Sequence, residues 1–192
     1  MDIGSYIAMA SIAVILLYAI LIYNGLVRIR HNVSKAWANI DVLLKQRHDE
    51  LPKLVAVCKG YMQHEREVLE NIVNARSMAS DARTHEDVKK VGESETLMRR
   101  GLNQLFMAVE AYPDLKADRQ FKHLQQRITG LENQIADRRE YYNETVRVNN
   151  TRIEMFPDII IARLFNFGQR IFLRFSEVER ADVHISTLFK AE

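Results

Sequence analysis

The chain of 192 residues has little of the residue types that crosslink or interrupt a fold, with one cysteine, three prolines and seven glycines. The single cysteine, Cys58, excludes an internal disulfide and fits a reducing compartment. The sequence has no Gly/Ser-rich linker, no low-complexity stretch and no internal repeat. This sparse punctuation is typical of a few long helices.

A strong charge of either sign is also lacking. The 27 lysines and arginines nearly balance the 25 aspartates and glutamates, and the net charge is only +2. A general nucleic-acid binder usually shows a marked basic excess or a basic stripe. We therefore expect no nucleic-acid partner.

Signatures of catalysis are absent as well. His64 and Glu65 begin a run like that of a zinc protease helix, but Val68 stands where the second histidine ligand must be. No glutamate stands three residues before a histidine, as a di-iron bundle needs, and no glycine-rich phosphate loop or Gly-x-Ser-x-Gly turn occurs. Cys58 lies on an apolar stripe, which favours a buried inert thiol over a nucleophile. We expect no enzyme, no metal and no cofactor.

The most distinctive feature that the sequence does have is a long apolar run at its N-terminus. The 25 residues from Ile3 to Val27 carry no charge. As a helix they would extend roughly 37 Å, enough to cross a hydrocarbon core of about 30 Å. A cleaved signal peptide would need a basic start, a shorter apolar run and a small-residue cleavage site, and none of these is present. The remaining chain is too small to bury so uniform a helix, so residues 3–27 are predicted to span a lipid bilayer.

The charges beside this run predict its orientation. Asp2 precedes it, whereas Arg28, Arg30 and Lys35 follow it. Basic residues stay on the cytoplasmic side, so the N-terminus is expected outside and the bulk of the chain in the cytoplasm. The same three basic residues are candidate contacts for anionic lipid, at about 1 kcal/mol each near the surface.

The rest of the chain is predicted to be all-α, an up-and-down antiparallel bundle of long helices that continues from the membrane helix. Apolar residues spaced by three and four predict helices over residues 28–79, 84–112 and 118–156. Pro52 is expected to kink or break the first of these near residues 48–51. The predicted core residues are Trp37, Ile40, Leu44, Leu54, Leu124, Ile128, Leu131, Ile135 and Phe156.

The expected organisation is a tail and membrane helix over residues 1–27, a bundle over residues 28–175 and a C-terminal tail over residues 176–192. Within the bundle, residues 158–175 are rich in Phe and Ile. With three antiparallel helices, this segment should lie at the end away from the membrane and fold back onto the bundle. It is interpreted as a clasp that closes the core, with a partner-binding or oligomerisation surface as the alternative.

Several runs of residues, in order along the chain, carry a resemblance to a known family. They are YNGLV at 23–27, AWANIDVLLKQR at 36–47, LPKLV at 51–55, KGYMQHE at 59–65, YPDLKA at 112–117, FKHLQ at 121–125, IADRR at 135–139, YN at 142–143 and FP at 156–157. Over about residues 20–175 the chain resembles the LemA family of bacterial membrane proteins.

The resemblance implies a short external tail, one membrane span and a helical bundle inside the cell. The family is not known for a catalytic reaction, and its pattern carries no functional residues to this chain. Some members are linked with membrane-bound zinc metalloproteases or with the formation of membrane organelles. The implied function is a non-enzymatic scaffold or adaptor in the bacterial inner membrane, which binds a protein partner, such as a membrane metalloprotease, or forms a homo-oligomer. A membrane-shaping or lipid-interacting oligomer, or an accessory subunit of a membrane protease, is the alternative.

Overall fold

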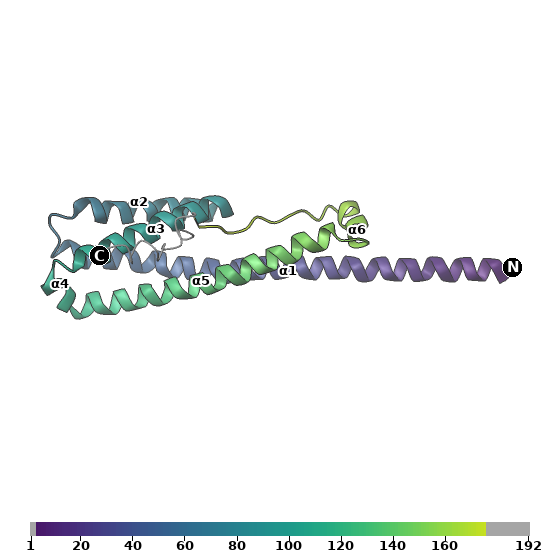
Figure 1. The fold of residues 1–192 in the computed structure, drawn as a ribbon, viewed down its shortest axis with the longest axis horizontal. Coiled ribbons are helices and arrows are strands. Elements are labelled where there is room, and N and C mark those ends of the chain that lie inside the picture. The colour runs from purple at the N-terminus through teal and green to yellow at the C-terminus, as the bar shows by residue number, and fades with distance from the viewer. Residues whose placement is uncertain (1–2, 176–192) are drawn as a thin grey trace, which may run out of the picture. The chain divides into compact units, whose positions relative to one another are not determined.

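The computed structural model describes residues 3–175, and within them all regular structure is helical (Figure 1). The helices are α1 (Ile3–Lys59), α2 (Arg66–Thr84), α3 (Val88–Val109), α4 (Pro113–Ala117), α5 (Arg119–Glu154) and α6 (Asp158–Leu164). The predicted all-α class is confirmed. The predicted tail, residues 176–192, lies outside the described residues.

The chain divides into two compact units, and α1 and α5 contribute to both. Unit 1 comprises the chain up to Val42 together with Ala136–Phe172, and unit 2 comprises Leu43–Ile135 together with the chain from Leu173 on. In each unit the apolar residues spaced by three and four along the helices form the interior.

Unit 2 holds the larger core, built from the later part of α1, α2, α3, α4 and the first part of α5. Leu54, Ile72 and Ile128 have no exposed surface. The predicted core residues of this unit are all buried, namely Leu44, Leu54, Leu124, Ile128, Leu131 and Ile135. α3 begins at the Asp87 cap, whose carboxylate accepts a hydrogen bond from the Lys90 backbone N–H at 3.1 Å, as expected for a helix start.

Unit 1 pairs the first part of α1 with the last part of α5. Trp37 is half-buried, and its ring lies 5.5 Å from that of Tyr142, while Ile40 is fully buried. The Tyr142 hydroxyl donates a hydrogen bond of 2.9 Å to the Ile171 carbonyl oxygen. Nearer the N-terminus, residues from α1, α5 and α6 form a small apolar group, the α1–α6 cluster: Ile22, Leu26, Ile153 and Ala162. Higher residue numbers in α5 meet lower ones in α1, so the two helices are antiparallel here.

The first helix predicted for the bundle is two helices. Instead of continuing to residue 79, α1 ends at Lys59, and a turn leads to α2 at Arg66. The turn is closed by the Met62 N–H, which donates to the Cys58 carbonyl oxygen at 2.8 Å. Gly60 stands just past the end of α1, where a residue of low helix propensity favours termination. The apolar spacing continues across this reversal, so the sequence pattern does not indicate it.

α1 continues through Pro52, so the break that was predicted as one of two outcomes does not occur. A proline has no N–H, so it leaves the carbonyl four residues earlier without its helical donor. That carbonyl belongs to His48, and the Arg76 Nε of α2 donates a hydrogen bond to it at 3.0 Å. A side chain from the neighbouring helix thus replaces the missing backbone bond.

This compensation predicts a thermodynamic coupling between two residues. Arg76→Ala should destabilise the protein by about 1–2 kcal/mol, because the His48 carbonyl then lacks a donor. In a Pro52→Ala background the same change should cost much less, since the alanine supplies the helical N–H that proline lacks. Urea unfolding of the full chain in detergent, followed by circular dichroism, measures the cycle. Equal costs of Arg76→Ala in both backgrounds would contradict the assignment.

The additional reversal also changes where the aromatic C-terminal segment lies. It was expected at the end away from the membrane. Instead, the Phe165 and Phe167 rings lie 4.8 and 5.8 Å from the ring of Tyr23, within the early part of α1. The reason is that α5 is the fourth long helix and not the third, so it returns toward the N-terminal part of α1.

Phe156 is not a core residue, although the sequence pattern placed it there. It is 81% exposed. α5 ends at Glu154, so Phe156 lies beyond the last helical turn and no longer follows the buried stripe. Residues 158–175 were interpreted either as a clasp that closes the core or as a binding surface, and the segment has features of both. Ala162, Leu173 and Phe175 are buried, as in a clasp, whereas Ile160 and Leu164 are exposed, as in a binding surface.

Candidate membrane-contacting and partner-binding sites

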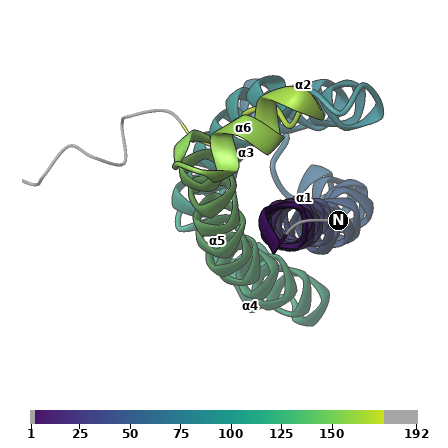
Figure 2. The same cartoon turned by 90° about the vertical axis from the view of Figure 1, so that its right-hand side faces the viewer.

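The first part of α1 is apolar, and no other described helix of unit 1 lies beside it in Figure 1; Figure 2 looks at α1 from its N-terminal end. Every residue from 3 to 21 except Ala19 is exposed, and the large apolar side chains among them are between 49% and 80% exposed. Among the described residues, α1 is the one helix that is long and apolar enough to cross a membrane, by length and composition. A soluble core helix of this composition would be covered, and this one is not.

The three basic residues predicted to follow the span are on α1 and exposed. Arg28 and Lys35 are seven residues apart and so share one face of the helix. Arg30 points elsewhere, with its guanidinium carbon 5.3 Å from the centre of the Phe167 ring. The structure therefore distributes these charges around the helix instead of gathering them in one patch. Asp2 lies outside the described residues.

No catalytic arrangement stands out in residues 3–175. Within this range no three His, Cys, Asp or Glu side chains are grouped so as to hold a metal ion. Cys58 has no exposed surface and belongs to the core of unit 2. Burial in apolar surroundings raises the pKa of its thiol to about 12. That the chain is not an enzyme stays a prediction.

The raised pKa of Cys58 gives a simple chemical test. Only the thiolate attacks alkylating reagents, and with a pKa of about 12 the thiolate fraction at pH 8 is about one in ten thousand. The folded full-length protein in detergent should therefore resist iodoacetamide at pH 8 and react readily in urea, as intact mass would show. Rapid labelling of the folded protein would mean that the thiol is accessible and its pKa ordinary.

A buried ionic cluster lies in the core of unit 2. The Arg47 guanidinium is 2% exposed, pairs with Glu95 at 2.5 Å and also forms an ion pair with Glu132. Arg99 Nε lies 3.0 Å from the second oxygen of Glu132. Two cations thus face two anions. Burial works to lower the pKa of Arg47, but the two carboxylates outweigh it and raise that pKa above its ordinary value.

The sequence carries a signal for this cluster. The apolar stripe of α1 passes from Leu44 to Leu51 with Arg47 between them, and Glu95 interrupts the stripe of α3. Charged residues in buried stripes are usually paired. Which residues pair follows only from the packing of α1, α3 and α5. The Arg47 Nε is buried and has no hydrogen-bond partner in the described residues.

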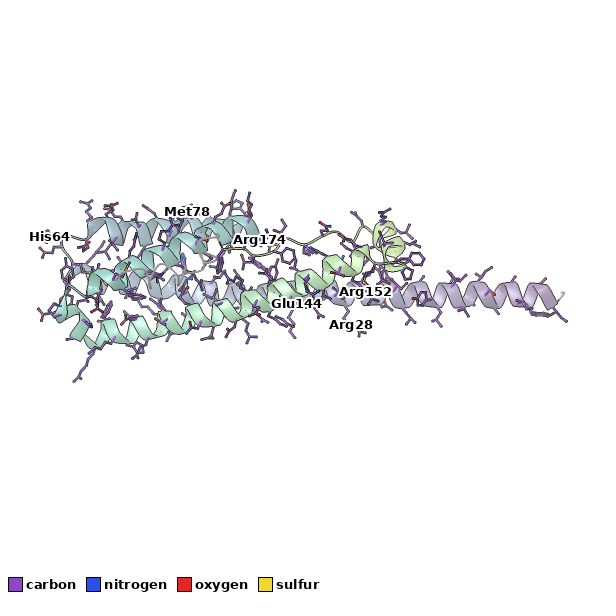
Figure 3. The ribbon with its side chains drawn as sticks, in the orientation of Figure 1. Arg28, His64, Met78, Glu144, Arg152 and Arg174 are labelled. Atoms are coloured by element: carbon purple, nitrogen blue, oxygen red, sulfur yellow. The ribbon has the colours of Figure 1, made fainter. Side chains whose placement is uncertain are left out.

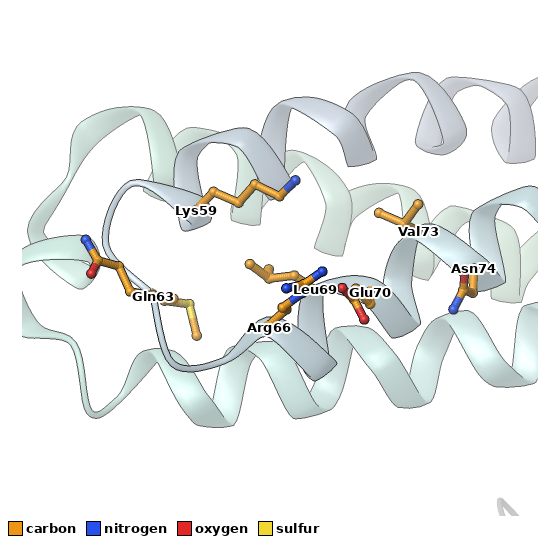
Figure 4. Close-up of a pocket in the computed structure, with 8 residues that line it drawn as sticks. Lys59, Gln63, Arg66, Leu69, Glu70, Val73 and Asn74 are labelled. Atoms are coloured by element: carbon orange, nitrogen blue, oxygen red, sulfur yellow. Dashed lines mark hydrogen bonds and ion pairs between the residues drawn. The ribbon is translucent and has the colours of Figure 1, made fainter.

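A groove in unit 2 separates the end of α1 from α2. A hollow of about 540 Å³ is followed by a second one of about 300 Å³, and both are lined by Lys59 and Val73. Figure 4 shows Lys59 of α1 across the first hollow from Val73 of α2. The apolar lining residues of this α1–α2 groove are Leu51, Pro52, Val55, Ala56, Met62, Leu69, Ile72 and Val73.

Charged side chains line the rim of the α1–α2 groove. Arg66 and Glu70 form an exposed ion pair of 2.6 Å on α2, and Lys59 lies at the end of α1. An apolar floor with a charged rim is the pattern of a groove that takes an amphipathic helix. Nothing in the spacing of the sequence predicted this groove, because it depends on how far α1 and α2 separate.

Comparison with known proteins identifies the family. Residues 36–186 match the model of the LemA family. The chain is also 29% identical over 170 residues to Protein LemA of Metamycoplasma hominis, an alignment that covers 86% of this chain and 74% of that protein. The family match covers well over half of the chain and confirms the resemblance seen in its sequence. This chain belongs to the LemA family.

Proposed function

We propose that this protein is a membrane-anchored, non-enzymatic adaptor that binds protein partners at the cytoplasmic face of the bacterial inner membrane. The observation that carries the anchor is the run of exposed apolar side chains over residues 3–21. Its 19 residues extend about 28 Å as a helix, close to the hydrocarbon thickness of a bilayer. Exposed to water, such a surface would drive aggregation.

The proposed orientation places the N-terminus outside and the part of the chain after the membrane span in the cytoplasm. Its support is the position of Arg28, Arg30 and Lys35, which follow the end of the uncharged run at Val27 within about two helical turns. Because α1 continues without a break from the exposed run to Lys59, it would connect the membrane span directly to the cytoplasmic part of the chain.

The proposed binding site for a protein partner is the α1–α2 groove. Its support is the apolar lining beside exposed charges, which fits a helix of a second protein, such as a membrane metalloprotease, or of another copy of this chain. A membrane adaptor needs such a surface on the part that leaves the bilayer.

The test is site-specific photo-crosslinking in intact membranes. A photoreactive residue at Ala56 or Val73 should give a defined crosslinked product, and the same residue at Met78, exposed on α2 outside the groove lining, should not. Mass spectrometry of the product then tells a partner from a second copy. The change Val73→Arg should remove the product obtained from Ala56 while leaving helix content unchanged. Equal products from Ala56 and Met78 would exclude the groove as the binding site.

A further inference from the structure

α6 lies directly beside the end of the exposed apolar run of α1 (Figure 1). Ile22 is the first buried residue of α1, and Leu26 is the next. Both pack in the α1–α6 cluster, and Tyr23 between them meets the rings of Phe165 and Phe167. The chain therefore begins to cover α1 at residue 22, inside the uncharged run that ends at Val27.

The side of α6 that does not face α1 is apolar and uncovered. Phe156, Ile160 and Leu164 are spaced by four residues and are 81%, 56% and 73% exposed. Phe165 does not belong to this side, because its ring lies 4.8 Å from that of Tyr23 on α1. We name Phe156, which stands just before α6, together with Ile160 and Leu164 the outer face of α6. A soluble surface seldom leaves three large apolar side chains within nine residues without a contact to cover them.

The length of the exposed run places α6 relative to a bilayer. Residues 3–21 match the hydrocarbon thickness, so the residues from Ile22 to Arg30 fall at the level of the lipid headgroups. α6 packs against this stretch and so lies at the same level. Tyr23 belongs to the type of side chain enriched there.

The exposed side chains at this level include positively charged arginines, which suit a surface of anionic lipid headgroups. Arg28 and Arg30 on α1 and Arg163 on α6 are exposed. Figure 3 shows Arg28 and Arg152 at the level of α6, where Arg152 is paired with Asp158. An apolar face bordered by arginines is the pattern of an element that lies in the membrane interface.

We propose that the outer face of α6 inserts into the cytoplasmic leaflet at the headgroup boundary, as a second membrane contact beside the span. This inference rests on the proposed anchoring by α1. The outer face belongs to the helix that packs on Ile22 and Leu26, directly after the exposed run, so that one lipid phase would cover both. A single membrane-spanning helix can tilt and rotate in a bilayer. A second apolar contact beside it, here the outer face of α6, would fix both its depth and its rotation.

The experiment places a polarity-sensitive fluorophore on single cysteines of the full-length protein, in a Cys58→Ala background. The tested changes are Phe156→Cys, Ile160→Cys and Leu164→Cys. Leu21→Cys, at the end of the exposed run, reports the span. Met107→Cys, 68% exposed near the end of α3, is the matched exposed control. The protein is reconstituted into vesicles of phosphatidylcholine and phosphatidylglycerol, with or without lipid that carries a quencher near the headgroup.

The expected result is quenching by lipid at positions 156, 160, 164 and 21, and none at 107. Quenching at 21 with none at the three α6 positions overturns this inference and leaves the anchor intact. A blue-shifted but unquenched signal on α6 also overturns it, because a protein surface would then cover the outer face. Absence of quenching at 21 overturns the anchoring itself, and this inference with it.

A second pair of variants tests the apolar contact without moving the label. Ile160→Glu with Leu164→Glu should abolish quenching at position 156, because carboxylates oppose entry into an anionic interface. The change Met78→Glu should leave that quenching unchanged. Emission of Trp37, the single tryptophan, shows whether unit 1 remains folded. Retained quenching at position 156 in the folded double variant would contradict the proposal.

Discussion

Replacing Arg47 by Met is expected to lower the free energy of unfolding by about 3–5 kcal/mol, because Glu95 is then left in the core without its counterion. Glu95 is 1% exposed and cannot recruit water in place of the guanidinium. Glu132 would be affected less, since it is 17% exposed and keeps Arg99 at 3.0 Å. Urea unfolding of the full chain in detergent, followed by circular dichroism, measures the loss.

The paired variant distinguishes charge from volume. Arg47→Met combined with Glu95→Leu removes both buried charges and should restore stability to within about 1 kcal/mol of the parent, or exceed it. Arg66→Ala is the matched control, because it also breaks an Arg–Glu pair, but one whose arginine is 86% exposed. It should leave the unfolding midpoint unchanged. If Arg47→Met were as mild as Arg66→Ala, the buried cluster would have no role in stability.

The change Gly92→Ala should release the chain around Arg174 from unit 2. A methyl group at position 92 would collide with the Arg174 carbonyl oxygen, which is backbone and cannot turn aside. Leu173 and Phe175 flank this contact and are buried, and the Phe175 ring lies 5.2 Å from the Arg99 guanidinium. Exposing both side chains to water would cost about 3–6 kcal/mol. We therefore expect a partial release of this segment, which lowers the free energy of unfolding by about 3 kcal/mol.

Hydrogen exchange read by mass spectrometry locates the effect. Amides of residues 171–175 should exchange faster in Gly92→Ala, while those of α2 remain protected. The control is Gly130→Ala, because a methyl group there meets nothing and a glycine inside α5 is replaced by a better helix former. That change should stabilise by about 0.5–1 kcal/mol. Unaltered exchange at residues 171–175 in Gly92→Ala would mean that α3 shifts instead.

The sequence by itself determined the class of the molecule. The uncharged run after Asp2 and the apolar spacing of Ile40, Leu44 and Leu54 are local properties, set by the length of a bilayer and the pitch of a helix. They led to an all-α chain with one candidate span, and the runs from Tyr23 to Pro157 led to the family. Such features can be recognised in the sequence without knowing which residues contact one another.

Only the tertiary structure decided which elements face one another. Gly60 was a weak point in a continuous pattern, and the turn after it adds a reversal that brings Phe165 and Phe167 to Tyr23. Arg47 and Glu95 are 48 residues apart, and their pairing depends on the packing of α1 against α3. The contact of Gly92 with the chain near Arg174 has the same origin. Apolar periodicity records which face of a helix is buried, but not the element that buries it, because many partners satisfy the same stripe.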